Sequence, residues 1–73
     1  MKIQIKKIGN TSFGSWCVFN AIINNNYVIN GIASFDADSI ELKEGNIYDD
    51  LVLYSRQKNG RVYYKIIIEK KDN

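Results

Sequence analysis

Apolar and polar residues alternate along most of this chain, with the period of two that is typical of strands burying one face. Five segments show this alternation or are rich in β-branched and aromatic residues, which favour strands. We expect a strand in each of them: Met1–Ile8, Trp16–Ile23, Tyr27–Phe35, Leu51–Arg56 and Val62–Glu69. The pattern therefore predicts an all-β chain of short strands.

The ends and interruptions of these strands carry their own signals. The Lys6–Lys7 step breaks the alternation, as a β-bulge would. Asn24–Asn26 suits a tight hairpin loop because Asn tolerates positive φ, and Asn59–Gly60 is a preferred two-residue hairpin turn. Gly31 lies inside the third strand, where glycine often marks a bulge or a sharp bend. Two hairpins and two irregular strands are therefore expected.

The stretch from Asp36 to Gly45 fits two structures. Asp36 or Asp38 could cap a helix of one or two turns that stops at Gly45. The alternation across 40–43 fits a short strand equally well. Residues 46–48 then return to the sheet, so we expect at most one short helix between the third and fourth strands. The polar tail 70–73 is expected to fray.

Alternate residues of each strand point to opposite faces, which separates a core face from an outer face. The core face is consistently apolar and comprises Ile3, Ile5, Cys17, Phe19, Ala21, Ile23, Ile29, Ala33, Phe35, Tyr64, Ile66 and Ile68. The outer face mixes polar residues with Trp16, Val18, Ile22 and Tyr63. We expect it to be exposed, although it is more apolar than solubility requires.

The order of strands and hairpins resembles the oligonucleotide/oligosaccharide-binding (OB) fold. The resemblance covers nearly the whole chain, and its particular features are Tyr27–Ala33 in the third strand and Glu44–Tyr48 before the fourth. It implies a single domain over residues 1–73, a five-stranded barrel that closes on itself and hides its strand edges. An SH3-like barrel is the competing fold.

Composition limits the chemistry that 73 residues can support. One cysteine and no histidine exclude an internal disulfide and a thiolate zinc cage, and remove the commonest general base. We therefore expect no catalytic residues, no metal and no cofactor. No apolar run approaches the ~20 residues of a membrane span, so we expect a cytoplasmic protein. So small a domain buries only roughly 60% of its unfolded surface, which makes a homo-oligomer a reasonable expectation.

The formal net charge is only +2, but the charges are unevenly distributed. Acidic residues cluster between Asp36 and Asp50, whereas the first strand and the last hairpin are basic. Single-stranded nucleic acid is bound by aromatic rings that stack on bases, beside cations that contact phosphates. The candidates for stacking are Phe13, Trp16, Tyr54 and Tyr63, and those for phosphate contacts are Lys2, Lys6, Arg56, Lys58, Arg61 and Lys65.

The resemblance to the OB family also implies where a ligand binds and which ligand it is. It implies that the loops Gly9–Ser15 and Gln57–Arg61 flank the ligand groove. The chain resembles the compact single-stranded-DNA-binding proteins of phages and mobile elements, so we expect it to bind single-stranded DNA or RNA without strong sequence preference. The alternative is a protein-binding module, an inhibitor or assembly subunit, whose apolar outer face or acidic stretch meets the partner.

Overall fold

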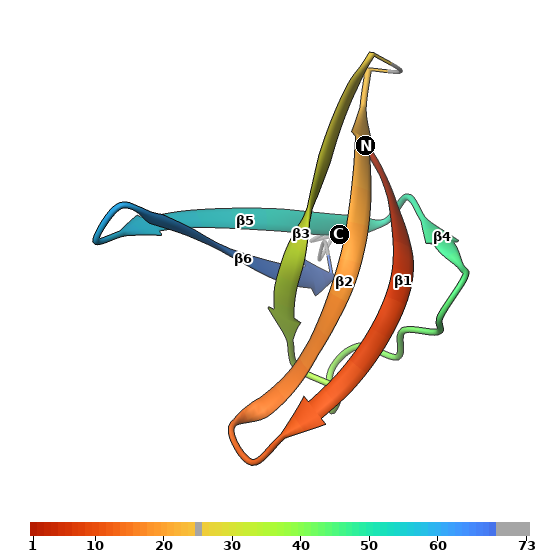
Figure 1. Ribbon diagram of the computed structural model, residues 1–73. Helices are drawn as coiled ribbons and strands as arrows, with labels where there is room; N and C mark the ends of the chain where they lie inside the picture. Colours follow the sequence, from red (N-terminus) through yellow and green to blue (C-terminus); the bar gives the residue numbers. More distant parts are fainter. Residues whose placement is uncertain (25, 69–73) are drawn as a thin grey trace, which may run out of the picture.

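A computed structural model describes residues 1–24 and 26–68 of the chain, and every strand in these ranges belongs to one sheet (Figure 1). The strands are β1 (Lys2–Thr11), β2 (Gly14–Ile23), β3 (Tyr27–Phe35), β4 (Ile47–Tyr48), β5 (Leu51–Lys58) and β6 (Arg61–Ile68). No helix occurs in the described ranges, and the all-β prediction is confirmed. The fraying expected for 70–73 falls outside the described residues.

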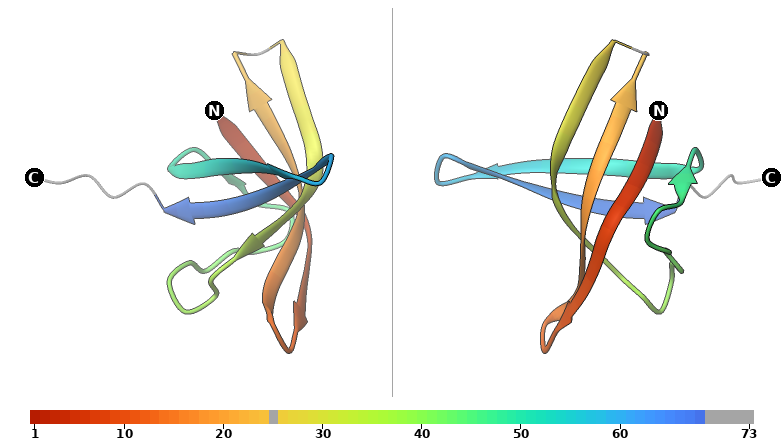
Figure 2. Two further views of the ribbon diagram at one scale, coloured as in Figure 1. Left: turned by 90° about the vertical axis from the view of Figure 1, so that its left-hand side faces the viewer. Right: turned by 45° about the vertical axis from the view of Figure 1, so that its right-hand side comes forward.

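The six strands are ordered β4-β1-β2-β3-β6-β5. The first four follow the Greek-key order, because β4 returns by a long connection to lie beside β1. β3 and β6 run parallel, and the other neighbouring strands are antiparallel. The sheet is open, and its edge strands β4 and β5 are separated in the chain by only Asp49 and Asp50. Figures 1 and 2 show the β5–β6 hairpin running across the β1–β2–β3 meander.

The bulge expected at Lys6–Lys7 is confirmed. The β1–β2 register shifts between Ile5, which pairs with Phe19, and Lys7, which pairs with Val18. Ile8 then faces Cys17 and packs against the core. The extra residue lets β1 resume its apolar alternation on the same face.

Both predicted hairpins are present, and of the two possibilities named for Gly31 the bulge does not occur. Asn59 and Gly60 both have positive φ, 53° and 78°, as the predicted turn requires. The β2–β3 register runs unbroken past Gly31. A Cβ at Gly31 would lie 3.1 Å from the Tyr64 ring, so this glycine makes room for that ring.

The core forms on the predicted face of the sheet. Of the predicted set, Ile3, Ile5, Cys17, Phe19, Ala21, Ala33, Phe35 and Ile66 are buried, and Ile23, Ile29 and Tyr64 are half-buried. Tyr64 meets Phe19 edge to face, with ring centroids 5.4 Å apart. The prediction for Ile68 is wrong, because it is 40% exposed at the end of β6.

Residues 36–46 form neither the helix nor the strand that were considered. The carbonyl oxygen of Asp36 accepts from the N–H groups of Ser39 at 3.0 Å and Ile40 at 2.9 Å, which closes one turn. Ile40 and Leu42 then bury their side chains in the core, together with Leu51. The N–H of Gly45 donates to the carbonyl of Ile5 at 2.7 Å, so the segment is tied to β1. It therefore supplies core side chains through an irregular backbone.

Candidate nucleic-acid interface

The outer face of the sheet carries a row of aligned side chains across four strands. Trp16 on β2 pairs with Ser34 on β3, Ser34 with Lys65 on β6, and Lys65 with Tyr54 on β5. Paired residues of neighbouring strands point to the same face of a sheet. Strands lie about 4.8 Å apart, so the row spans about 15 Å from Trp16 to Tyr54. It brings together three of the residues predicted to bind nucleic acid, and we call these four residues the central row.

A second pair lies beside the central row on the same face. Tyr63 pairs with Arg56, and each is two residues from a member of the central row. Tyr54 and Tyr63 are 54% and 53% exposed, so both rings are accessible to a ligand. The structure therefore places two exposed tyrosines, Arg56 and Lys65 in one area of the β5–β6 hairpin.

Three predicted residues belong to hairpin tips. Lys58 and Arg61 pair with each other beside the Asn59–Gly60 turn. This tip projects on the side of the molecule opposite β4 in Figures 1 and 2. Phe13 lies at the β1–β2 turn and is fully exposed. Each tip therefore presents a predicted ligand-binding group at one border of the sheet.

The two predicted lysines of β1 lie apart from this cluster. Lys2 faces outward opposite Ile22, six residues along β2 from Trp16, which is about 20 Å at the rise of a strand. Lys6 is the extra residue of the bulge and has no register partner in β2. Lys7, which sequence reasoning left out, pairs with Val18 on the outer face instead. The predicted bulge could have identified Lys7, because an extra residue in β1 shifts the alternation by one position. Lys7, and not Lys6, then points to the outer face.

Trp16 is half-buried and not fully exposed. Its indole lies against Gly9, its partner on β1, and a Cβ at that position would collide with the ring. The absence of a side chain at Gly9 therefore lets the ring lie close to the backbone of β1. A ring held in this way loses little rotamer freedom when a ligand binds.

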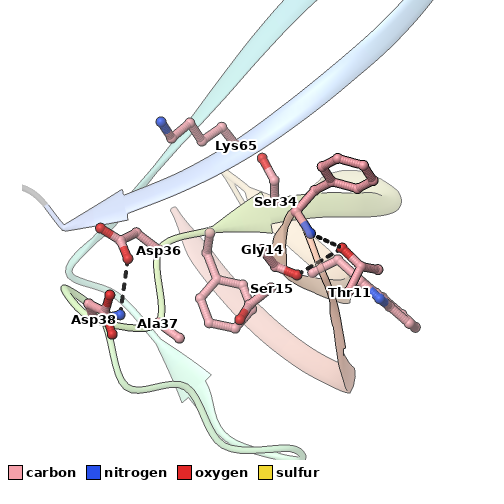
Figure 3. A pocket seen from close by; sticks show the side chains of 11 residues that line it. Thr11, Gly14, Ser15, Ser34, Asp36, Ala37, Asp38 and Lys65 are labelled. Carbon is pink, nitrogen blue, oxygen red and sulfur yellow. Dashed lines mark hydrogen bonds between the residues drawn. The ribbon is translucent and has the colours of Figure 1, made fainter.

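Three residues of the central row also line a hollow in the surface, which lies where β2 begins and β3 ends (Figure 3). This cavity, which we call the end hollow, has a volume of about 590 Å³, and its walls include Phe13, Trp16, Ser34, Asp36, Asp38 and Lys65. Such a volume is in the range of small-molecule sites. The β2–β3 register places Ser34 beside Trp16, whereas the β3–β6 pairing brings Lys65 to the hollow and the Asp36 turn brings the two aspartates. The sequence did not suggest the two aspartates as neighbours of Trp16, because an irregular turn places them there.

The Asp36 carboxylate is held by its own turn. Oδ1 accepts from the backbone N–H of Asp38 at 3.0 Å, and Oδ2 accepts from the Ser39 hydroxyl at 2.9 Å. The Ser39 hydrogen bond, then the Asp38 hydrogen bond and the nearby charge of Lys65, lower the pKa of Asp36 below its usual value. The end hollow therefore has an ionised carboxylate on one wall at neutral pH.

Cys17 offers no nucleophile at neutral pH. Its predicted burial in the core is confirmed, and this burial raises the pKa of the thiol to about 11. The thiolate is the reactive form of cysteine. At neutral pH Cys17 therefore contributes to packing.

The described ranges 1–24 and 26–68 contain neither a cluster of metal-ligating side chains nor a membrane-spanning helix. No group of three or more histidine, cysteine, aspartate or glutamate side chains there could hold a metal ion. In the same part of the chain no helix has the length and apolar character that crossing a bilayer requires. Compared with known proteins, the chain matches no protein-family model, no curated protein and no solved structure.

Proposed function

We propose that this chain is an OB-type domain that binds single-stranded nucleic acid, most simply DNA, by stacking bases on aromatic rings beside phosphate-binding cations. The OB fold is a partly open Greek-key barrel that binds ligands on the face of its second and third strands. The β4-β1-β2-β3 order and the curvature of the sheet support this assignment (Figure 2). So do the short connection between the two edge strands and the position of the turns at Phe13 and Asn59–Gly60.

The observation that carries the proposal is the central row together with its neighbours Tyr63 and Arg56. Three aromatic rings and two cations lie together there on one outer face, with Trp16 at one end of the row and Tyr54 at the other. Each base stacked on such a ring contributes roughly 1–3 kcal/mol to binding by alanine substitution. Every base has a π face, so stacking of this kind depends little on sequence.

The charges on this face suit a nucleic-acid strand better than the net charge of +2 suggests. Arg56, Lys58, Arg61 and Lys65 all lie on the β5–β6 hairpin, which has no acidic residue within its described length. Each phosphate contact releases a counterion, so affinity falls as salt rises, with a slope of about −0.7 per contact for single strands. Four contacts predict a slope of about −3 in a plot of log affinity against log salt concentration.

The experiment is a fluorescence titration with single-stranded and double-stranded oligonucleotides of one sequence, between about 50 and about 200 mM salt. We expect the Trp16 emission to change on adding the single strand, and the affinity to fall with the slope given above. Tyr63→Ala should weaken binding about tenfold, because one stacking contact is lost. Tyr27→Ala is the matched control, since Tyr27 is also exposed but lies at the far end of β3.

Three outcomes of these experiments would contradict the proposal. Emission that stays unchanged at low salt, with no shift of a labelled oligonucleotide in a gel, would exclude binding on the central row. Equal losses in Tyr63→Ala and Tyr27→Ala would place the ligand elsewhere. Tighter binding of the duplex would exclude base stacking as the source of affinity.

The competing function, a protein-binding module, is supported by β3. Its outward side chains Val28 and Ile32 are apolar and 53% and 62% exposed, and exposed apolar surface is typical of protein-interaction sites. In the part of the chain that the structure describes, residues 27–32 pair with β2 alone, since β6 meets β3 only at 33–34. A free edge of this kind can pair with another strand. Light scattering that gives a stable oligomer indifferent to oligonucleotides would favour this function.

A further inference from the structure

The end hollow differs from the rest of the proposed interface because carboxylates form part of its wall. Asp36 and Asp38 lie on one side of it, while Thr11 and Ser34 lie on the other (Figure 3). Phe13 and Trp16 supply aromatic surface, and one cation, Lys65, belongs to the lining. A site that only held phosphates would not place two acidic side chains there.

The two aspartates determine which part of a nucleotide can enter. A phosphate in the hollow would face both carboxylates, and like charges at short range repel. A base has no net charge and can place its flat face against the ring of Trp16 or Phe13. Ser34 lies between Trp16 and Lys65 in the central row, and its small side chain leaves space in the hollow for a base. The hollow therefore suits a base, while the backbone of the strand stays over the β5–β6 cations.

The Asp36 carboxylate is oriented and can still accept hydrogen bonds. Each of its oxygens accepts one hydrogen bond within the turn, from Asp38 N–H and from the Ser39 hydroxyl. A carboxylate oxygen has two lone pairs, so one on each oxygen remains. Asp36 and Asp38 are both exposed, so the free lone pairs can reach a ligand without displacing protein groups. An acceptor fixed in this way selects a base that presents donors.

We propose that the end hollow binds one unstacked base of the strand and prefers guanine, because Asp36 or Asp38 accepts hydrogen bonds from the guanine N1–H and N2–H groups. Single-stranded bases are read on their Watson–Crick edges. Guanine presents two adjacent donors there, which one carboxylate can accept together. Thymine and uracil present one N–H between two carbonyl oxygens, which a carboxylate repels. This inference rests on the proposed function and adds a preference at one position to binding that is otherwise independent of sequence.

The test compares oligonucleotides of about twelve nucleotides, within the usual site size of an OB fold: all thymidine, or thymidine with one central guanosine. Fluorescence anisotropy of the labelled oligonucleotide gives both affinities. We expect the guanosine-containing strand to bind about tenfold tighter, the discrimination typical of a two-bond contact. In the double variant Asp36→Asn/Asp38→Asn this ratio should fall to about one, while binding of the all-thymidine strand stays equal or strengthens.

Asparagine is chosen because its side-chain oxygen can still accept from the backbone N–H of residue 38, so the turn is retained. Asp49→Asn is the control, because it removes one carboxylate charge outside the hollow and should leave the ratio unchanged. Thermal unfolding checks that each variant folds.

The outcomes separate this inference from the proposed function. If the wild-type protein binds both strands equally, the guanine preference is wrong and the proposed function stands. A preference that survives in the double variant, or disappears in Asp49→Asn, also overturns the role of the two aspartates. If neither strand binds at low salt, the proposed function fails and the inference fails with it.

Discussion

Two glycines determine how aromatic side chains pack in this domain. Gly9 leaves space for the Trp16 indole on the outer face, and Gly31 leaves space for the Tyr64 ring in the core. Neither has a positive φ, so both are explained by close approach and not by a special backbone conformation. A single added methyl group would move a ring of the proposed interface in one case and the Phe19–Tyr64 pair in the other.

Burial of the Cys17 thiol should make the free energy of unfolding fall at alkaline pH. Its pKa is raised from 9.0 to about 11 in the folded protein, so the folded state holds the thiol proton more tightly than the unfolded state does. The resulting stabilisation is fully present below pH 9 and is lost as the pH rises towards about 11. The loss should be on the order of 3 kcal/mol.

Urea unfolding at a series of pH values measures this loss. Cys17→Ala lacks the thiol, so its free energy of unfolding should fall less between pH 9 and about 11 than that of the wild type. All other side chains are common to both proteins, so their contributions cancel in the comparison. Parallel pH curves for the two proteins would show that the buried thiol does not contribute.

At the level of elements, the irregular segment 36–46 contributes to the core as the strands do. Leu42 is buried beside the core although no strand contains it, whereas its neighbour Glu41 is exposed. Leu42→Ala should lower the free energy of unfolding by about 2–3 kcal/mol, from lost burial and the cavity left behind. Glu41→Ala should change it by less than about 0.5 kcal/mol. Thermal or urea unfolding compares the two, and similar losses would mean that the segment does not cover the core.

The strands were predictable because alternation with a period of two is a local pattern. It also located the bulge in β1 and most of the core face. The contribution of Ile40 and Leu42 was not predictable in this way, since two apolar residues in an irregular segment indicate no face until the segment folds against β1. β4 was expected only as a return to the sheet and forms a separate strand of two residues.

The candidate interface was partly predictable for a related reason. Parity along each strand put Trp16, Tyr63 and Lys65 on the outer face, and cross-strand register then aligned Trp16 and Lys65 with Tyr54. The end hollow depends on the parallel pairing of β3 with β6. That contact joins residues about thirty apart in the chain. The alternation of apolar and polar residues is a local pattern and cannot predict such a contact.

For the whole molecule, the low net charge conceals a separation of charges. The acidic residues of the described ranges all fall between Asp36 and Asp50, in the segment that leads into and out of β4. The hairpin that carries Lys58 and Arg61 projects on the opposite side (Figure 1). Electrostatic steering of a nucleic-acid strand depends on this local field more than on the sum of the charges.

The most direct test of the proposed interface is a nuclear magnetic resonance titration of the ¹⁵N-labelled protein with a short oligothymidylate at low salt. The proposal predicts that the largest shifts occur at the Trp16 indole N–H and at the amides of Ser34, Lys65 and Tyr54. The resonance of the Ile47 amide on β4 should not shift. An unchanged spectrum, or shifts confined to 27–32 of β3, would contradict base stacking on the central row.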